Sequence, residues 1–345
     1  MTVPPTTVRL DELAVPVIGA PMAGGASTPQ LVAAVNRAGG LGFLAAGYRD
    51  AAGMAEQIAQ VRALSGRPFG MNLFVPAAPG DRDAVAAYRE RLRPEARRRG
   101  VTLPEEIGPD RDDWDAKLSV LLADPVPVVS YTFGLPTAAE AAAVRAAGSL
   151  QVGTVTTPAE ARAAEAVGMD ALCVQGPEAG GHRGTHRVAD EPGGAPLLDL
   201  LPAVRAVTAL PLIAAGGLGD GPAVAAALRA GAVAVQLGTA LLRADESGAP
   251  AAHRSALTAM PETVVTRAFT GRPARGLRND FIDRYGRYAP PAYPEVHHLT
   301  RPLRVAATSD ADTTAMHLWA GTAHRLTRPG PAADIVARLW HSARG

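Results

Sequence analysis

Short apolar runs alternate along the chain with longer stretches in which apolar residues recur every three or four positions. The runs are rich in residues that favour strands and are bounded by glycine, proline or polar residues. Runs of this length and composition are typical of buried strands in a parallel sheet. They predict strands at Val17–Ala20, Leu41–Ala45, Phe69–Phe74, Val126–Tyr131, Leu150–Val155, Asp170–Val174, Pro211–Ala215 and Val233–Leu237.

The stretches between the runs predict helices. The first begins near Thr28, because Ser27 or Thr28 can cap it and Pro29 fits its first turn, and Gly39 ends it. Strands that alternate with helices form a parallel sheet, and eight such units close into a barrel. The fold class is therefore predicted as α/β, a (β/α)8 TIM barrel. Further helices are predicted at Asp50–Leu64, Ala138–Ala147, Pro158–Val167, Pro196–Val207 and Gly221–Ala230.

Two segments depart from this rhythm. Residues 75–124, after the third strand, are polar and rich in proline and arginine, and we expect an insertion that forms a lid over the barrel. The last hundred residues or so mix prolines, aromatic residues and short helical patterns at Thr313–Leu326 and Ala332–Arg338. We therefore expect a barrel domain at residues 1–249 and a C-terminal helical cap at residues 250–345 that packs on it.

The composition excludes several classes of protein. A formal net charge of +1 gives no reason to expect a nucleic acid or a membrane as partner. The basic run Arg89–Arg99 contains glutamates at helical spacing and is expected to be a solvated helix face. A single cysteine, Cys173, expected in the core, and no signal-peptide pattern predict a cytoplasmic protein. The single lysine, Lys117, lies in a polar segment, which argues against Schiff-base catalysis.

The stretch Asp170–Gly184 carries the first chemical signal. Its apolar residues end at Gln175, and a glycine-rich loop follows that holds one imidazole, His182. Glycines let the backbone approach a flat ligand, and a histidine exchanges protons near neutral pH. Loops that follow the carboxyl ends of barrel strands are where ligands bind. The loop is either a ligand site that includes His182 or an ordinary flexible loop with an exposed histidine.

Glycines also follow the seventh and eighth predicted strands. The seventh ends in Gly216-Gly217-Leu218-Gly219, and the eighth in Gln236-Leu237-Gly238-Thr239. In barrels these two neighbouring loops commonly bind a phosphate through backbone N–H groups, although either could serve only as a tight turn. A dinucleotide site is rejected, because the glycine spacing is wrong and no acidic residue follows at the position that would bind a ribose.

Other strand ends offer polar groups. The carboxamides of Asn72 and Gln175 can bond an edge of mixed donors and acceptors such as an isoalloxazine ring, or serve as a turn residue and a strand cap. No metal is expected, because the pair His182 and His186 lies in a loop rather than on one helix face. His297–His298 is expected to be solvated.

Several motifs, taken together, resemble the nitronate monooxygenases, formerly called 2-nitropropane dioxygenases. They run in family order over nearly the whole chain: GAPMAGG from Gly19, GMNLF from Gly70, VQGPEAGGHRG from Val174, LIAAGGLGDG from Leu212, VQLGTALL from Val235, TRAFTGRPARGLRNDFI from Thr266, LTRPLRVAA from Leu299 and LWAG from Leu318. One departure is visible: the family often continues with Gln-Gly after this last motif, whereas this chain has Thr322-Ala323-His324. We expect this departure to affect which substrate is used more than whether a flavin is bound.

The resemblance implies non-covalent FMN and the oxidation of alkyl nitronates by O2 to carbonyl compounds and nitrite. It implies His182 as the catalytic histidine. The implied FMN-binding residues are Met22, Asn72, Gln175, Gly180, Gly181, Gly216, Gly217, Gln236, Leu237, Gly238 and Thr239.

Three functions stay open at this point. The first is an FMN-dependent monooxygenase that acts on small nitronates, with nitroalkanes as further substrates. The second is an FMN-dependent enoyl-thioester reductase, or another reductase that uses NAD(P)H, on the same barrel. The third is a barrel that has lost catalysis and binds FMN or a phosphate metabolite. The physiological substrate and the oligomeric state, a homodimer included, are also open.

Overall fold

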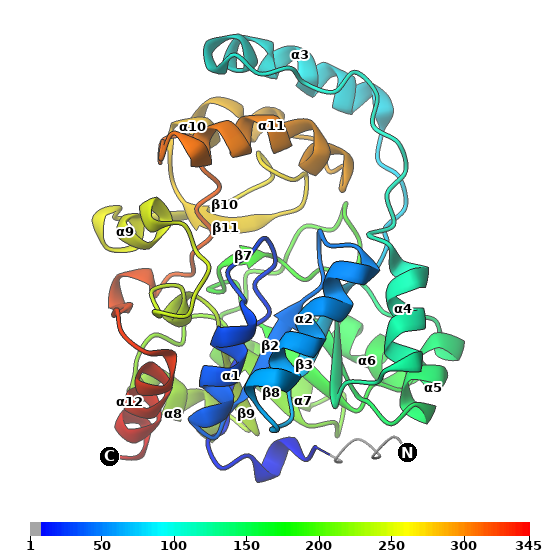
Figure 1. Ribbon diagram of the computed structural model, residues 1–345, viewed down its shortest axis with the longest axis vertical. Helices are drawn as coiled ribbons and strands as arrows, with labels where there is room; N and C mark the ends of the chain where they lie inside the picture. Colours follow the sequence, from blue (N-terminus) through cyan, green and yellow to red (C-terminus); the bar gives the residue numbers. More distant parts are fainter. Residues whose placement is uncertain (1–7) are drawn as a thin grey trace.

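Eight parallel strands close into a barrel in the computed structural model, which describes residues 8–345 (Figure 1). Strand β1 pairs with β2 on one side and with β9 on the other, which closes the ring. The predicted barrel is therefore confirmed, and each predicted strand has its counterpart. The strands are β1 (Val17–Gly19), β2 (Leu41–Ala45), β3 (Gly70–Phe74), β4 (Val128–Thr132), β5 (Leu150–Val155), β6 (Ala171–Gln175), β8 (Leu212–Ala215) and β9 (Ala234–Leu237).

Helices surround the barrel, and side chains cap several of them. Thr28 accepts a hydrogen bond from the Leu31 amide at the start of α1, and Asp220 accepts one from Ala223 at the start of α8. The last helix of the chain, α12, contacts α8 and α1 and so takes the eighth position around the barrel. The surrounding helices are α1 (Pro29–Arg37), α2 (Ala51–Leu64), α4 (Trp114–Ala123), α5 (Ala138–Ala146), α6 (Pro158–Val167), α7 (Leu197–Arg205), α8 (Gly221–Arg229) and α12 (Ala332–Arg344).

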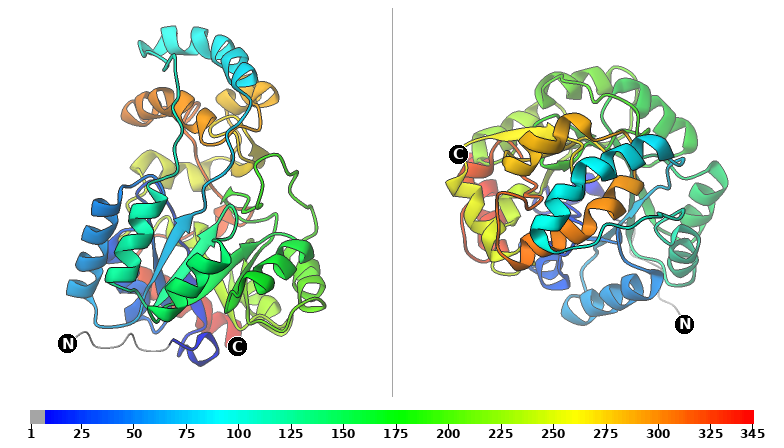
Figure 2. Two further views of the ribbon diagram at one scale, coloured as in Figure 1. Left: turned by 90° about the vertical axis from the view of Figure 1, so that its right-hand side faces the viewer. Right: turned by 90° about the horizontal axis from the view of Figure 1, so that it is seen from above.

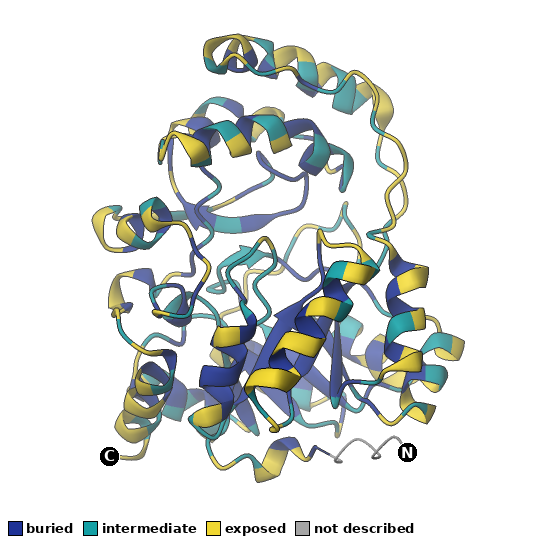
Figure 3. Cartoon of the chain, viewed as in Figure 1, coloured by how far each residue is buried: buried dark blue, intermediate teal, exposed yellow. Residues whose placement is uncertain are grey.

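Successive side chains of a strand point to opposite faces, so the barrel has an inner and an outer apolar layer. Phe43 and Cys173 belong to the inner layer, whereas Leu44 and Val174 pack outward against the helices. Both faces of the barrel strands are thus covered, as Figure 3 shows. The expectation that Cys173 is a core residue is confirmed, since it is buried. No helix within residues 8–345 has the length and apolar character needed to cross a membrane.

A lobe covers the carboxyl ends of the strands (Figure 1). Its centre is a three-stranded antiparallel sheet in the order β10 (Thr263–Thr266), β11 (Ala274–Leu277) and β7 (Gly181–His182). The helices of the lobe are α9 (Ala251–Ala259), α10 (Asp280–Tyr285) and α11 (Glu295–Ser309), and short 3-10 turns of the chain fall at Leu10–Glu12, Thr239–Leu241, Gly286–Tyr288 and His324–Leu326. The segment after residue 250 therefore contains strands as well as helices, and its last helix belongs to the barrel wall.

The helix predicted at Thr313–Leu326 is wrong. Part of the backbone of this segment bonds to another strand rather than to a helical partner: the Leu277 amide donates to the Leu318 carbonyl, and the Ala320 amide donates to the Arg275 carbonyl. Only a 3-10 turn at His324–Leu326 is helical there. Pairing with the edge of β11 thus overrides the local helical pattern.

The insertion after β3 rises above the lobe as one long helix, α3 (Arg82–Arg99), which lies over α11 (Figure 2). The segment that leaves the barrel is shorter than predicted, because α4 at its far end packs against α2 and α5 on the barrel wall. Asp81 caps α3 and Gly100 ends it in the left-handed conformation. The helix is joined to the barrel by two extended arms.

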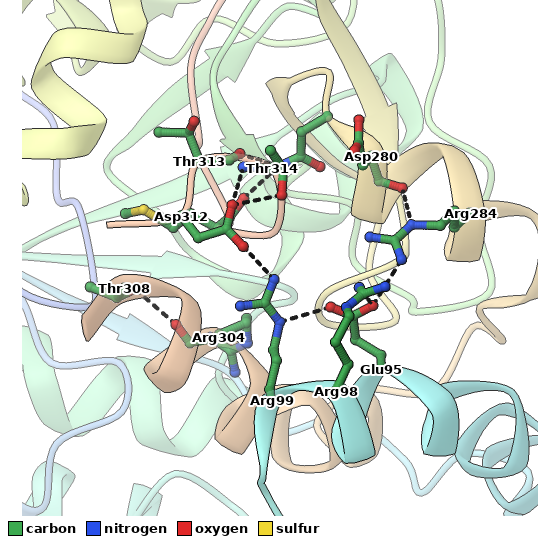
Figure 4. Close-up of polar contacts among 12 residues, drawn as sticks. Glu95, Arg98, Arg99, Asp280, Arg284, Arg304, Thr308, Asp312, Thr313 and Thr314 are labelled. Atoms are coloured by element: carbon green, nitrogen blue, oxygen red, sulfur yellow. Dashed lines mark hydrogen bonds and ion pairs between the residues drawn. The ribbon is translucent and has the colours of Figure 1, made fainter. Parts of the chain in front are cut away.

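The basic run on α3 is more than a solvated face. Glu95, whose side chain is 0% exposed, pairs with Arg98, Arg99 and Arg284 of α10 (Figure 4). Burial by itself would raise the pKa of Glu95, but the hydrogen bonds from Arg98 and Arg99 outweigh it and lower the pKa. Arg99 also reaches Asp312 at 2.5 Å. These contacts fasten the end of α3 to the lobe.

Candidate active site

A cavity of about 840 Å3 lies between the carboxyl ends of the barrel strands and the lobe. This is the face on which barrels carry their ligand sites. All the residues predicted for the site line this one cavity, although they come from several strand ends and a loop. They are Met22, Asn72, Gln175, Gly180, Gly181, His182, Gly216, Gly217, Gln236, Leu237, Gly238 and Thr239.

The glycine-rich loop after β6 is held by side chains at several points. Gln175 Nε2 donates to the His182 carbonyl at 2.9 Å, and the Gly184 amide donates to Gln175 Oε1 at 2.8 Å. Arg183, 1% exposed, donates to the carbonyls of Gly176 and Gln175. The loop is thus ordered by its own hydrogen bonds. The carboxamide of Gln175 serves this purpose, which is the capping role that the sequence left open.

The two glycine loops after β8 and β9 present free backbone donors. Gly216 and Gly217 have φ of 115° and 72°, a conformation that glycine adopts at little cost. Within residues 8–345 the amides of Gly217, Leu218, Gly238 and Thr239 make no hydrogen bond. The nearby Glu178 carboxylate accepts a hydrogen bond from the Leu197 amide at the start of α7. Free amides on two neighbouring glycine loops fit a phosphate group.

Asn72 is held with its oxygen available. Its Nδ2 donates to the Ser130 carbonyl at 3.2 Å and lies 2.9 Å and 3.0 Å from the hydroxyls of Ser130 and Thr132. Because a carbonyl can only accept, the nitrogen of Asn72 is the atom that faces β4. The oxygen has no hydrogen-bond partner in the described part of the chain, so it can accept an N–H from a ligand in the cavity.

His182 stands at the centre of the lobe side of the cavity. Its backbone belongs to β7 and pairs with Ala274 of β11, and its Nε2 lies 2.9 Å from Thr270 Oγ1. Aromatic rings of Phe133 and Trp319 lie 5.4 Å from its centroid. Thr270 Oγ1 also lies 3.4 Å from the Arg272 carbonyl, to which its hydroxyl can donate. In that arrangement Thr270 accepts from Nε2–H of the neutral ring, and Nδ1 keeps a free electron pair.

The surroundings of His182 keep the ring neutral. Burial lowers the pKa of His182 to about 3, and the positive charges of Arg272 and Arg304 act in the same direction. At neutral pH the ring is therefore uncharged. Positive charge in this part of the cavity comes from the arginines instead.

Arg304 is a site residue that the sequence reasoning missed. It is 8% exposed and lines the cavity, where its Nε donates to Thr300 Oγ1 at 3.1 Å and its Nη2 to the His297 carbonyl at 2.8 Å. It pairs with no carboxylate in the described residues. A buried guanidinium without an acid favours an anionic ligand. The signal was the spacing of His297, Thr300 and Arg304, which puts all three on one face of a helix.

The expectation that His297 is solvated is wrong. His297 is 7% exposed and stacks on the ring of Tyr48, with centroids 4.1 Å apart and planes 5° from parallel. Burial lowers the pKa of His297 strongly, and Arg304 adds to the effect. Only its neighbour His298 reaches the surface, where it lies 2.8 Å from Asp110. The polar character of this segment concealed a helix with one buried face.

The structure also places Lys117 and His186. Lys117, which lies in a polar segment of the sequence, is 1% exposed, and its Nζ pairs with Asp112 at 2.7 Å and donates to the Ala46 carbonyl. An ammonium group held in an ion pair is not a nucleophile, so the burial of Lys117 gives no reason to expect Schiff-base catalysis. His186 Nε2 bonds the Thr154 carbonyl at 3.0 Å, and residues 8–345 contain no group of three His, Cys, Asp or Glu side chains that could hold a metal ion.

Fold and cavity together define a (β/α)8-barrel enzyme whose ligand site combines free amides, a fixed carboxamide and a neutral histidine. The family model described as nitronate monooxygenase matches residues 8–342. The chain therefore belongs to the nitronate monooxygenase family and is an oxidoreductase. Enzymes of this family are in general flavin-dependent.

Known proteins similar to this chain agree with the family. The nitroalkane oxidase from Streptomyces ansochromogenes is 52% identical, superposes with a TM-score of 0.94, and each chain covers 97% of the other. A probable nitronate monooxygenase of Staphylococcus aureus strain Newman is 36% identical over 330 residues, which are 94% of this chain and 93% of that protein. FabK from Thermotoga maritima is 25% identical with a TM-score of 0.76, over 98% of this chain and 97% of its own.

Proposed function

We propose that this protein binds FMN non-covalently and oxidises small alkyl nitronates with O2 to carbonyl compounds and nitrite. The observation that carries the proposal is His182, a neutral imidazole with a free Nδ1 beside an unpaired buried guanidinium, in a cavity that also offers phosphate-binding amides. Membership of the nitronate monooxygenase family supports it. The similar Streptomyces protein is named a nitroalkane oxidase, which makes nitroalkanes candidate substrates as well.

The residues present fit FMN. The amides of Gly217, Leu218, Gly238 and Thr239 would hold its phosphate. The Asn72 oxygen, fixed by β4, would accept a hydrogen bond from an N–H of the ring. Met22 and Gly181 also line the cavity and would contact the ring system. When bound, the flavin supplies the electron transfer that no side chain of this protein can supply.

The protein's own groups handle charge and protons. A nitronate is an anion, and Arg304 offers it a positive charge inside a cavity where such an interaction is strong. A neutral nitroalkane must first lose its α-proton. His182 Nδ1 takes that proton while the electrons of the C–H bond pass to the nitro group, which gives the nitronate and a protonated ring. The negative charge of the nitronate then stabilises the ring cation that forms beside it.

Flavin reduction without oxygen tests the proposal. The purified protein is mixed anaerobically with a nitronate such as that of nitroethane, and in a separate experiment with NADPH, while the flavin absorbance is followed. We expect bleaching with the nitronate and formation of nitrite when O2 is admitted. Rapid bleaching by NADPH alone, with none by the nitronate, would refute the proposal in favour of a reductase. A protein that binds added FMN but is bleached by neither would be a binding protein.

A further inference from the structure

Arg272 is a buried arginine that takes no part in the chemistry proposed above. It lies in the turn between β10 and β11, and its side chain is 0% exposed. Nη1 donates to the Thr185 carbonyl at 2.8 Å and Nη2 to the Phe133 carbonyl at 3.4 Å. Its Nε is buried and has no hydrogen-bond partner among the described residues. A charge that is this deeply buried and bonded only to carbonyl groups is costly, so it requires a reason.

The groups that Arg272 contacts also lie around His182. Phe133 follows β4, and its ring lies under the guanidinium, 4.1 Å away, and against the edge of the His182 ring. Thr185 is three residues after His182 in the same loop. The Arg272 carbonyl accepts from Thr270, whose hydroxyl holds His182 Nε2. One side chain therefore ties together the hairpin, the glycine-rich loop and the segment after β4, which are the three elements that surround the imidazole.

Within residues 8–345 no carboxylate forms an ion pair with Arg272, although Asp190 acts on its charge from a greater distance. The charged and titratable groups that face His182 are Arg272 from the hairpin, Arg304 and His297 from α11, Tyr293 before α11, and His317 from the segment beyond it. The two arginines carry positive charge, and the two other histidines have lowered pKa values and are neutral. Every full charge that His182 senses is thus of the sign that opposes its protonation.

We propose that Arg272 is a positioning residue for His182: its guanidinium holds Phe133 against the imidazole and, through the Thr185 carbonyl, holds the loop that carries His182. Its positive charge also opposes protonation of the ring before a substrate anion arrives. The inference rests on the proposed function only in that it gives His182 the task of a base. The arginine has to be planar and charged: the plane covers Phe133 and Tyr293, at 4.1 Å and 5.4 Å, while two nitrogens reach two carbonyls. A lysine keeps the charge but reaches one carbonyl, and a glutamine keeps a donor but loses the charge.

The first test is a titration of the wild-type chain. The full-length protein, as purified, is labelled at its histidine rings, and NMR follows each of its eight histidines with pH. The His182 signals are those lost in His182→Asn. We expect the ring to stay neutral, with the proton on Nε2, from pH 8 down to about pH 5. A His182 ring that titrates near its ordinary value of about 6.5 would overturn the inference without any variant.

Two variants then separate charge from shape. In Arg272→Gln we expect the pKa of His182 to rise by about one unit or more, because a like charge is removed. In Arg272→Lys we expect the ring to stay neutral while kcat falls about tenfold or more through loss of orientation. Equal titration of His182 in Arg272→Gln and wild type, or a rise in Arg272→Lys as large as in Arg272→Gln, would refute the electrostatic part.

Arg183→Gln is the matched control. Arg183 is as buried as Arg272 and also bonds carbonyls of the glycine-rich loop, but it is not among the charges that shift His182. It is expected to lower stability and to leave the titration of His182 unchanged. The titrations do not depend on turnover, so a failure to oxidise nitronates would refute the proposed function and leave the inference standing, while an ordinary His182 in an active nitronate oxidase would do the reverse.

Discussion

Gly180 offers a direct test of how the lobe closes over the glycine-rich loop. A Cβ at this position would lie 2.5 Å from the Gly321 amide nitrogen and 2.6 Å from the Ala320 carbonyl carbon. Both are backbone atoms, so no side chain can turn aside to make room. Segment 320–322 is held in place by the Gly321 amide, which donates to Thr239 Oγ1 at 2.9 Å, and by the Thr322 amide, which donates to the Glu178 carbonyl at 3.0 Å.

The Gly180→Ala substitution must therefore move one backbone segment. The new carbon is roughly 1 Å too close, since ordinary contact begins near 3.4 Å. Overpacking of this kind costs about 1–3 kcal/mol, and each of the two hydrogen bonds that would be lost contributes about 1 kcal/mol. A total of roughly 3–5 kcal/mol corresponds to a change of at least about a hundredfold in an equilibrium constant. Because Thr239 lies in the proposed phosphate loop, much of this cost is expected in FMN affinity.

A glycine outside the cavity supplies the control. Gly231, between α8 and β9, has a φ of +99°, and a Cβ there would meet no atom within 4 Å, so Gly231→Ala suffers only backbone strain of about 1–2 kcal/mol. FMN affinity is measured from the quenching of flavin fluorescence, and stability from thermal unfolding. We expect Gly180→Ala to bind FMN far more weakly than Gly231→Ala. Equal affinity in the two variants would show that the 320–322 segment does not close over the site.

Four further predictions follow from individual groups. Gly217→Asp is expected to abolish retention of FMN by placing a carboxylate beside the free amides, whereas Gly217→Asn, of similar size, is expected to retain more; equal loss would place the phosphate elsewhere. His182→Asn is expected to slow nitroalkane turnover about a hundredfold or more while nitronate turnover falls much less, and similar losses on both substrates would remove the base role. Stability is expected to fall as pH decreases below about 6.5, because His182 binds a proton in the unfolded chain but not in the folded protein, where its pKa is about 3. The variant His182→Asn should therefore make a plot of unfolding free energy against pH less steep by about 1.4 kcal/mol per pH unit. Glu95→Gln is expected to loosen α3 and to speed its proteolysis, with the exposed Glu90→Gln as control, and equal cleavage of both would show that the Glu95 network does not hold the helix.

Local patterns were sufficient for the barrel and for much of its ligand-binding face. Apolar runs and capping residues such as Thr28 act on residues close to them in sequence, so the sequence is enough to predict the strands and helices that they form. The same holds for glycines after strands: because parallel strands end at one edge, Gly217 and Gly238 had to lie near each other. Local patterns also marked His182 and Asn72, to which the resemblance to a known family assigned catalytic and FMN-binding roles, and both line the cavity.

The lobe was decided by contacts that no local pattern contains. The segment predicted as a helix at Thr313–Leu326 instead bonds to β11 and to the glycine-rich loop. These partners satisfy its backbone groups, but they are distant in sequence, so the local pattern of residues does not reveal them. His297 and Lys117 look solvated by their neighbours in sequence, yet tertiary packing buries both. Nothing in the local sequence distinguishes Arg272 and Arg304 from other arginines. The fold buries both, and their charges then act on His182. The sequence by itself determined the barrel, its glycine loops and the imidazole among them. Only the tertiary structure decided that this imidazole is neutral, because its protonation depends on burial and on the charges of Arg272 and Arg304, which are far from it in sequence.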